Sequence, residues 1–409
     1  MIPIKPFVGS KPWAIVLCKF SDHPEEPQNA QFFRDFVTRG NGGINDYFAD
    51  ISSNQMNLDG SQVFGWFNLP YTLDDDKKRP GSRYERILAA VNAVQQTVDF
   101  RPFYGICVML NATVDSGGLP GPQTLSFREE KPRPYGLVVL DNLAWGNTWA
   151  AQEMAHGFSL DHSWSSDPDV EYGNPFDVMS AFTNNYGFDD TRFAVSGPGM
   201  NAPNLDLLGW LPPGRIFSVP RVIHHSSIGF PFTSTLTTDL TVSALGHPDT
   251  PGLLAATINA KNVSIGPFAY YIEFRKNDRW DRALDEPSVV IHQVRLDDKN
   301  YLVSLARGKN HLSQGEIFND ATNEIKIQFV SQTDNVATIR IISSVTHSFR
   351  EAVDGPNQDD WHIYERVLDI LHIYEKARVR EINLLVREIK SAATSNSRPS
   401  GSQSEFDQF

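Results

Sequence analysis

The stretch Asn147-Thr-Trp-Ala-Ala-Gln-Glu-Met-Ala-His-Gly-Phe-Ser-Leu-Asp-His-Ser163 decides the expected fold of this chain. Gln152 and Glu153 lie four and three residues before His156, so on a helix all three side chains share one face. Gly157 marks the expected end of that helix, because glycine accepts the left-handed conformation favoured at helix C-termini. The spacing therefore predicts a helix over 146–157 that presents an amide, a carboxylate and an imidazole together.

His162 lies six residues beyond His156, close enough for the chain to fold back over the same face of the helix. Hydrolytic zinc sites hold the metal with about three protein ligands, leave one position open for water and place a base beside that water. The stretch therefore predicts Gln152, His156 and His162 as zinc ligands and Glu153 as the catalytic base.

This pattern resembles the extended zinc signature of metzincin-type peptidases, H-E-x-x-H-x-x-G-x-x-H followed by a Met-turn. In this chain the signature reads Gln152-Glu153-x-x-His156-x-x-Ser159-x-x-His162. The segment Asn174-Pro-Phe-Asp-Val-Met179-Ser resembles the Met-turn, which implies that Met179 forms an apolar floor under the metal. Two positions depart from the family pattern: Gln152 replaces the first ligand histidine, and Ser159 replaces the glycine of the turn.

The beginning of the chain resembles the N-terminal part of immune-inhibitor-like (M6-type) peptidases. The likeness rests on an apolar strand over 12–20, the run Gly42-Gly-Ile-Asn-Asp-Tyr-Phe48 and the run Val63-Phe-Gly-Trp-Phe-Asn-Leu-Pro70. A short helix expected within 197–211 also resembles the way the catalytic domain closes in that family. The resemblance implies a peptide or protein substrate and a leading strand and first helices that support the catalytic helix.

Periodicity and turn signals predict an α+β fold. Helices are expected over 29–38, 43–50 and 82–98, and strands over 12–20, 58–69, 104–110 and 135–140. Beyond Pro212-Pro213-Gly214, short apolar runs over 253–259, 269–275, 288–296, 300–305, 325–331 and 335–343 predict an all-β sandwich. The expected organisation is a metzincin-like catalytic domain over 1–213 with a mixed sheet and the zinc-site helix, and a β-sandwich domain over 214–347.

In the last part of the chain, apolar residues at helical spacing predict one long helix over 356–392. The Ser-rich composition of 393–409 predicts a flexible tail. The apolar face of the helix is wider than a coiled-coil seam. It is expected to pack either on the body of the chain or on a second copy, which would make a homo-oligomer.

Composition excludes several classes of partner. The net charge of −13 argues against nucleic acid and against an anionic membrane as the main partner, because both reward clustered Lys and Arg. No apolar run reaches the length of a membrane span, and no signal peptide is visible, so the protein is expected in the cytoplasm unless a leader was removed. Cys18 and Cys107 lie in apolar runs and are expected to be buried free thiols.

The substituted ligand leaves three hypotheses for the site. A neutral amide oxygen binds zinc more weakly than imidazole, so in the first hypothesis Gln152 is the ligand, or a water takes its place, and the enzyme works with a looser site. Another residue could instead supply the third ligand, and His23, Asp161 and Glu171 are the candidates. In the third hypothesis the site holds no metal, and the protein is an inactive pseudopeptidase that binds peptides or assembles.

The loop after His162 is rich in carboxylates, with Asp167, Asp169, Glu171 and Asp177 within eleven residues. Hard carboxylate oxygens suit calcium or a substitute ligand for the zinc site. A solvated acidic loop is the interpretation we prefer.

Overall fold

The computed structural model describes residues 6–79, 81–127, 131–181, 185–225, 232–297 and 299–349. Helices and strands are mixed along these residues, which confirms the predicted α+β class. The predicted helix over 356–392 and the tail over 393–409 lie outside the described residues, so self-association through that helix stays a prediction. The predicted domain boundaries also stay predictions.

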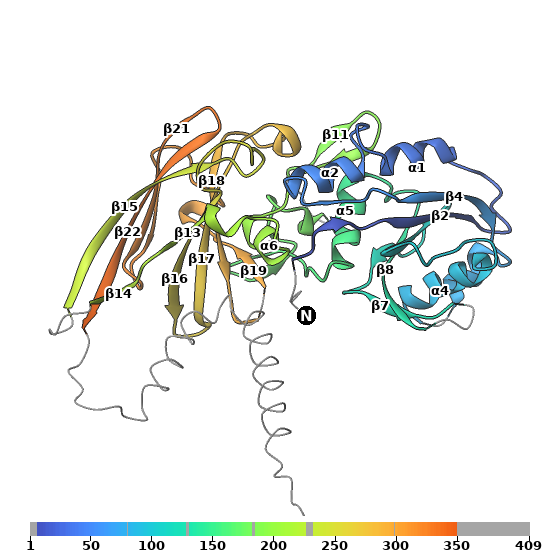
Figure 1. Cartoon of the computed structure of the whole chain (residues 1–409), viewed down its shortest axis with the longest axis horizontal. Helices are drawn as coiled ribbons and strands as arrows, with labels where there is room; N and C mark the ends of the chain where they lie inside the picture. The colour runs from blue at the N-terminus through green and yellow to red at the C-terminus, as the bar shows by residue number, and fades with distance from the viewer. Residues whose placement is uncertain are drawn as a thin grey trace, which may run out of the picture.

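A six-stranded sheet forms the N-terminal part of the molecule (Figure 1). Its four long strands are parallel to one another, and two short strands run antiparallel to the last of them. In spatial order the strands are β4 (Gln62–Asn68), β2 (Trp13–Lys19), β5 (Gly105–Leu110), β8 (Arg133–Leu140) and β6 (Gly117–Gly118), with β7 (Gln123–Leu125) also paired to β8. The strands predicted in this part are confirmed. The apolar runs of β2 and β5 follow from burial of both faces of the sheet.

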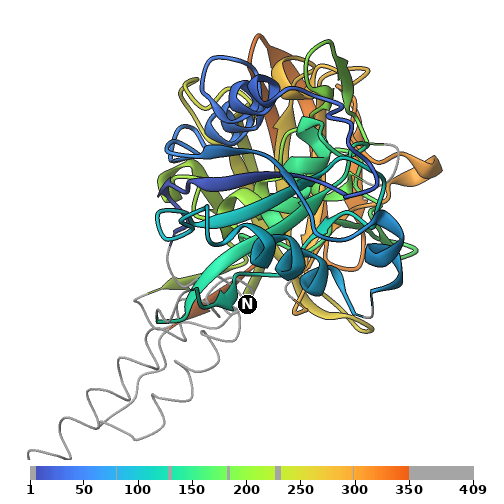
Figure 2. The ribbon, with the colours of Figure 1, turned by 90° about the vertical axis from the view of Figure 1, so that its right-hand side faces the viewer.

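Helices cover both faces of this sheet. Alternate residues of a strand point to opposite faces. Trp13 and Ile15 therefore pack with α1 (Ala30–Val37), α2 (Ile44–Ile51) and α5 (Asn147–His156), whereas Ala14 and Val16 pack with α4 (Arg83–Val94). Figure 2 shows α4 in cyan below the strands and the blue helices α1 and α2 above them. The predicted helices over 29–38, 43–50, 82–98 and 146–157 are confirmed to within a few residues.

The β-rich part consists of a seven-stranded and a five-stranded sheet whose side chains share one hydrophobic cluster, as a sandwich requires. The seven-stranded sheet runs β10 (Val170–Glu171), β9 (Trp164–Ser165), β19 (Asn300–Leu302), β18 (Ser288–Val294), β17 (Gly266–Arg275), β16 (Ala255–Asn262), β13 (Ile216–Val219). The five-stranded sheet contains β14 (Val222–His225), β22 (Val336–Phe349), β21 (Ile325–Thr333), β20 (Ile317–Asp320) and β15 (Phe232–Ser243), the last paired to β22. Every strand predicted in this part is present.

The twelve residues of β15 were not predicted as a strand. Most of them are polar, and all but Leu240, Val242 and Ser243 are at least partly exposed, so they lack the apolar signal on which the prediction relied. The strand forms because Phe232 to Ser243 pair in continuous antiparallel register with β22, from His347 to Val336. Pairing with β22 therefore stabilises this strand, although few of its own side chains are buried.

The seven-stranded sheet contains strands from both sides of residue 214. β9 begins two residues after His162, and it pairs in parallel with β19 through Trp164 opposite Tyr301. β10 pairs with β9 and ends the sheet on that side. The chain segment that follows the motif resembling a zinc signature is therefore held in place by the β-rich part of the protein.

The remaining elements are short: β1 (Gly9–Ser10) paired with β3 (Met56–Asn57), β11 (Phe188–Asp190) paired with β12 (Ala194–Ser196), α3 (Leu73–Lys78), α6 (Ala202–Leu207), and the 3-10 turns η1 (Val178–Ser180), η2 (Pro213–Arg215), η3 (Arg279–Asp281) and η4 (Ala306–Gly308). Cys18 and Cys107 are buried free thiols, as expected. Among the helices that the structure describes, none combines the length and the apolar character needed to cross a bilayer.

Candidate functional site

Helix α5 carries the predicted site and is enclosed by other elements. Gln152, Glu153 and His156 are buried together with the apolar residues of the helix. At its first turn, the side-chain amide of Asn147 donates to Gly42 O and to Ser196 Oγ, both at 2.9 Å. These bonds fix the start of the helix relative to α2 and β12, so the side chains one and two turns later are held in a defined place.

The helix ends at Gly157, but not by the mechanism that the sequence suggested. Gly157 has φ −61° and ψ −20°, a right-handed conformation, so the expected left-handed glycine is wrong. A side chain would be crowded there, because a Cβ would lie 3.0 Å from Met154 O and 3.3 Å from Gly136 Cα. The left-handed residue is Ser159, with φ 74°. The chain therefore makes its turn toward His162 at the position where the metzincin signature has glycine.

Replacing Ser159 with Gly should raise the free energy of unfolding by about 0.5–1 kcal/mol, because glycine adopts a positive φ without the steric cost that serine carries. Chemical denaturation measures the change. Ser218→Gly is the matched control: Ser218 is exposed on β13 and is not among the residues with positive φ, so the same substitution should destabilise the protein. Equal effects at both positions would contradict the explanation.

The two predicted histidine ligands lie side by side. The ring centroids of His156 and His162 are 4.7 Å apart, and the ring planes are inclined by 77°. His156 Nδ1 lies 2.9 Å from Leu160 O, and because a carbonyl only accepts, Nδ1 carries the hydrogen. Burial lowers the pKa of His156, which the nearby charge of Glu153 opposes only in part. The lowered pKa favours the neutral imidazole, in which Nε2 is the lone-pair nitrogen because Nδ1 carries the hydrogen.

His162 has an oxygen partner at each ring nitrogen. Nδ1 lies 2.7 Å from Glu171 Oε1, and Nε2 lies 2.9 Å from the hydroxyl oxygen of Tyr172. Burial and then the charges of Glu171 and Glu153 raise the pKa of Tyr172, so its hydroxyl keeps the proton and donates it to Nε2. In this arrangement Nδ1–H of His162 donates to the carboxylate. Both histidines thus have Nδ1–H bound to an oxygen acceptor.

The carboxylate of Glu153, the predicted base, is held by two donors. Gly118 N–H donates to Oε2 at 2.6 Å, and the side-chain amide of Gln152 donates to Oε1 at 3.1 Å. Gly118 lies on the short edge strand β6, and a Cβ at that position would lie 2.1 Å from Glu153 O. Only glycine lets β6 approach the helix closely enough for this hydrogen bond.

Gln152 is used at both ends of its side chain. Its carbonyl oxygen Oε1 accepts from Ala181 N–H at 2.7 Å, and its NH₂ group donates to Glu153. The atom that would bind a metal is therefore already paired with the segment that follows η1. Gln152 connects the predicted Met-turn to the predicted base.

Met179 is fully buried in η1, and its carbonyl accepts from Ser163 N–H at 3.2 Å. The predicted Met-turn is thus tied to the residue that follows His162. Of the substitute ligands proposed from the sequence, Glu171 contacts His162, whereas Asp161 faces Lys299 at 3.8 Å. His23 lies beside Asp22 beyond the end of β2.

The residues that the structure describes contain no group of three or more His, Cys, Asp or Glu side chains placed to hold a metal ion. Zinc, and calcium at the acidic loop, therefore stay predictions. In the acidic loop Asp167, Asp169 and Glu171 are exposed, as the preferred interpretation expected, whereas Asp177 is completely buried. Part of the loop also forms the short strands β9 and β10. Burial raises the pKa of Asp177 to about 6, although hydrogen bonds from Ser163 and Met179 act against it.

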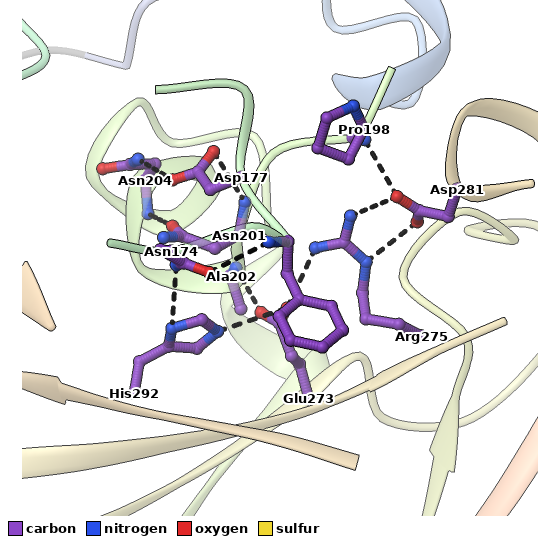
Figure 3. A network of polar contacts seen from close by, with 12 residues as sticks. Asn174, Asp177, Pro198, Asn201, Ala202, Asn204, Glu273, Arg275, Asp281 and His292 are labelled. Carbon is purple, nitrogen blue, oxygen red and sulfur yellow. Dashed lines mark hydrogen bonds and ion pairs between the residues drawn. The ribbon is translucent and has the colours of Figure 1, made fainter. Parts of the chain in front are cut away.

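Sequence reasoning missed a buried polar network next to the predicted Met-turn (Figure 3). Asp177 accepts from Asn204 Nδ2 at 2.7 Å, and the backbone N–H of Ala202 donates to Glu273 Oε2 at 2.5 Å. Glu273 lies on β17, so the network joins helix α6 and the Met-turn segment to the β-rich part. The signal in the sequence was a pair of charged residues, Glu273 and Arg275, inside the apolar run of β17.

Arg275 contributes a guanidinium to this network (Figure 3), and an arginine side chain stays charged at every physiological pH. Its Nη1 atom lies 3.1 Å from Oε1 of Glu273, and its guanidinium forms a bidentate pair with the carboxylate of Asp281. Burial acts to lower the pKa of Arg275, but Asp281 and Glu273 outweigh it and raise the pKa. Burial alone would raise the pKa of Glu273, yet His292 and Arg275 hold it below its usual value. The network therefore contains mutually dependent buried charges.

No family model matches this chain, and no curated protein matches it in sequence. Among solved structures, two crystal forms of wild-type OgpA from Akkermansia muciniphila match with a TM-score of 0.32 and 9% sequence identity. The matches cover 72% and 73% of this chain and 92% and 94% of OgpA. A likeness of this size carries no argument about family or function, and the resemblance to immune-inhibitor-like peptidases stays a prediction.

Proposed function

We propose that this protein hydrolyses peptide bonds with the help of a divalent metal ion bound by His156 and His162. Zinc is the first candidate for that ion. The proposal rests on one observation: two imidazoles meet at 4.7 Å, each with Nδ1 paired to an oxygen acceptor. Metal-binding histidines commonly donate their second N–H to a carbonyl or a carboxylate, which orients the ring and makes the free nitrogen a better donor. The chemistry of this donor pair fits zinc.

A divalent ion at this position would supply a bound water that ionises near neutral pH. Glu153 is the base for that water and returns the proton to the leaving amine of the peptide. The donors from Gly118 and Gln152 fix its carboxylate, so Glu153 needs no reorganisation to accept a proton. Gln152 in this scheme is a positioning residue rather than a ligand.

The second candidate function is peptide binding without hydrolysis. It is favoured by the bond between Gln152 Oε1 and Ala181 N–H, which occupies the side-chain oxygen at the position where the signature has its first ligand histidine. In that case the site would hold peptides without a metal. Only hydrolysis requires a metal bound to the protein, so measuring the metal content of the protein distinguishes the two functions.

Elemental analysis after zinc loading and dialysis should find about one zinc per chain, and a chelator should remove both the metal and the peptidase activity. Gln152→His should tighten zinc binding at least about tenfold, or about 1.4 kcal/mol, because it adds an imidazole at a position whose amide oxygen is paired with Ala181. Gln31→His on the exposed face of α1 is the control for simply adding a histidine. A protein that takes up no zinc, alone or with His at 152, would favour peptide binding without hydrolysis.

A further inference from the structure

We propose that Tyr172 provides the third protein ligand of the metal site, in place of the imidazole that Gln152 does not supply. This inference rests on the proposed metal site and names the group that completes it. The hydroxyl oxygen of Tyr172 lies 2.9 Å from His162 Nε2, the nitrogen that faces away from Glu171. The two rings also pack against each other, with centroids 4.1 Å apart and planes inclined by 39°.

The proton shared between the Tyr172 oxygen and His162 Nε2 lies where a metal ion would bind both atoms in this inference. Two donor atoms bound to one tetrahedral zinc, at about 2.0–2.1 Å each, lie about 3.3 Å apart. The observed 2.9 Å between the phenol oxygen and Nε2 is within a few tenths of an ångström of that separation. A metal ion can therefore replace the shared proton after a small adjustment. The phenol proton goes to solvent, and the phenolate oxygen and Nε2 each bind the ion.

The backbone at Tyr172 is shaped for this contact. Successive residues of a strand point to opposite faces, so Glu171 and Tyr172 would ordinarily diverge. Tyr172 instead has φ 58°, an unusual conformation for a bulky aromatic residue, and both side chains reach the same imidazole. The carboxylate takes Nδ1 and the phenol takes Nε2. An observed backbone outlier of this kind is a reason to look for a function.

The β-rich part of the protein holds this arrangement. Glu171, the last residue of β10, pairs with Trp164 of β9, and Trp164 pairs with Tyr301 of β19. Arg295 further anchors the hairpin through Asp169, at 2.7 Å. Tyr172 therefore lies at the end of a hairpin that is paired with β19. A metal ligand requires such support, because it must be held in a defined position.

Titration calorimetry with Zn²⁺, comparing the full chain with Tyr172→Phe, tests the inference. The variant removes one oxygen atom and should weaken zinc binding at least about tenfold, or about 1.4 kcal/mol. Loading with Cu²⁺ gives a second readout: the unmodified chain should show a visible phenolate-to-metal absorption band that the variant lacks. Tyr186→Phe is the control, because Tyr186 packs on Phe176 and should change neither measurement.

Three outcomes separate the two proposals. Weaker zinc binding and loss of the copper band in Tyr172→Phe, with Tyr186→Phe unchanged, support the inference. Equal zinc affinity of the Tyr172→Phe variant and the unmodified chain overturns it while leaving the proposed metal site intact. Absence of zinc and copper binding in the unmodified chain overturns the metal site and this inference with it. Thermal unfolding of each variant checks that the comparison is made on folded protein.

Discussion

Glu153→Gln should reduce peptide hydrolysis about 10²- to 10⁴-fold, the usual contribution of a positioned general base. The amide cannot accept a proton from water, yet it has nearly the same shape as the carboxylate. Zinc content should stay unchanged, because Glu153 accepts from Gly118 and Gln152 and is not a ligand in this proposal. Initial rates on a peptide substrate, with zinc measured in the same samples, give the result.

Glu316→Gln is the matched control for Glu153→Gln. Glu316 pairs with Lys309 at 2.7 Å on the surface of the β-rich part, so the same chemical change there should leave hydrolysis unaltered. A full rate in Glu153→Gln with bound zinc would show that another group is the base. A reduced rate accompanied by lost zinc would show instead that the carboxylate supports the metal.

Arg275→Met should lower the free energy of unfolding by about 3–5 kcal/mol. Arg275 is completely buried between Glu273 and Asp281, and removing it leaves two carboxylates in the interior without their cation. Desolvated unpaired charges cost far more than the lost contact itself. Urea unfolding followed by tryptophan fluorescence measures the change.

Arg340→Met tests whether burial is the cause. Arg340 also forms a bidentate pair, with two 2.7 Å bonds to Asp239, but the side chains of Arg340 and Asp239 are 40% and 48% exposed. An exposed pair contributes at most about 1 kcal/mol. A loss of similar size in the two variants would contradict the argument, because it would mean that pair geometry matters and burial does not.

The sequence allowed the framework of the fold to be predicted where burial leaves a local signal. The apolar runs of β2, β5 and β8 and the periodic face of α4 were assigned correctly because the residues that face the core are apolar. β15 was missed because its stability comes from pairing with a distant strand, which no local pattern records. Distant pairing is also why the hairpin after His162 was interpreted as a solvated loop.

The candidate site shows the same division. Spacing on a helix was enough to place Glu153 and His156 together, and the turn at Ser159 brings His162 beside them. The sequence could not show that Gln152 Oε1 would be taken by Ala181, since that contact joins residues 29 apart. Tyr172 was not singled out because a tyrosine in an acidic loop has no distinguishing pattern, and only the fold brings it to the imidazole.

The pairing of β9 with β19 links residues that lie more than a hundred positions apart in the chain. Substitutions near residue 300 can therefore shift the hairpin that presents Glu171 and Tyr172, and so alter the candidate site from outside the motif. An evolutionary or mutational survey confined to the neighbourhood of the helix would overlook the positions on β19 that hold this hairpin. Engineering of this protein should vary both segments in the same library.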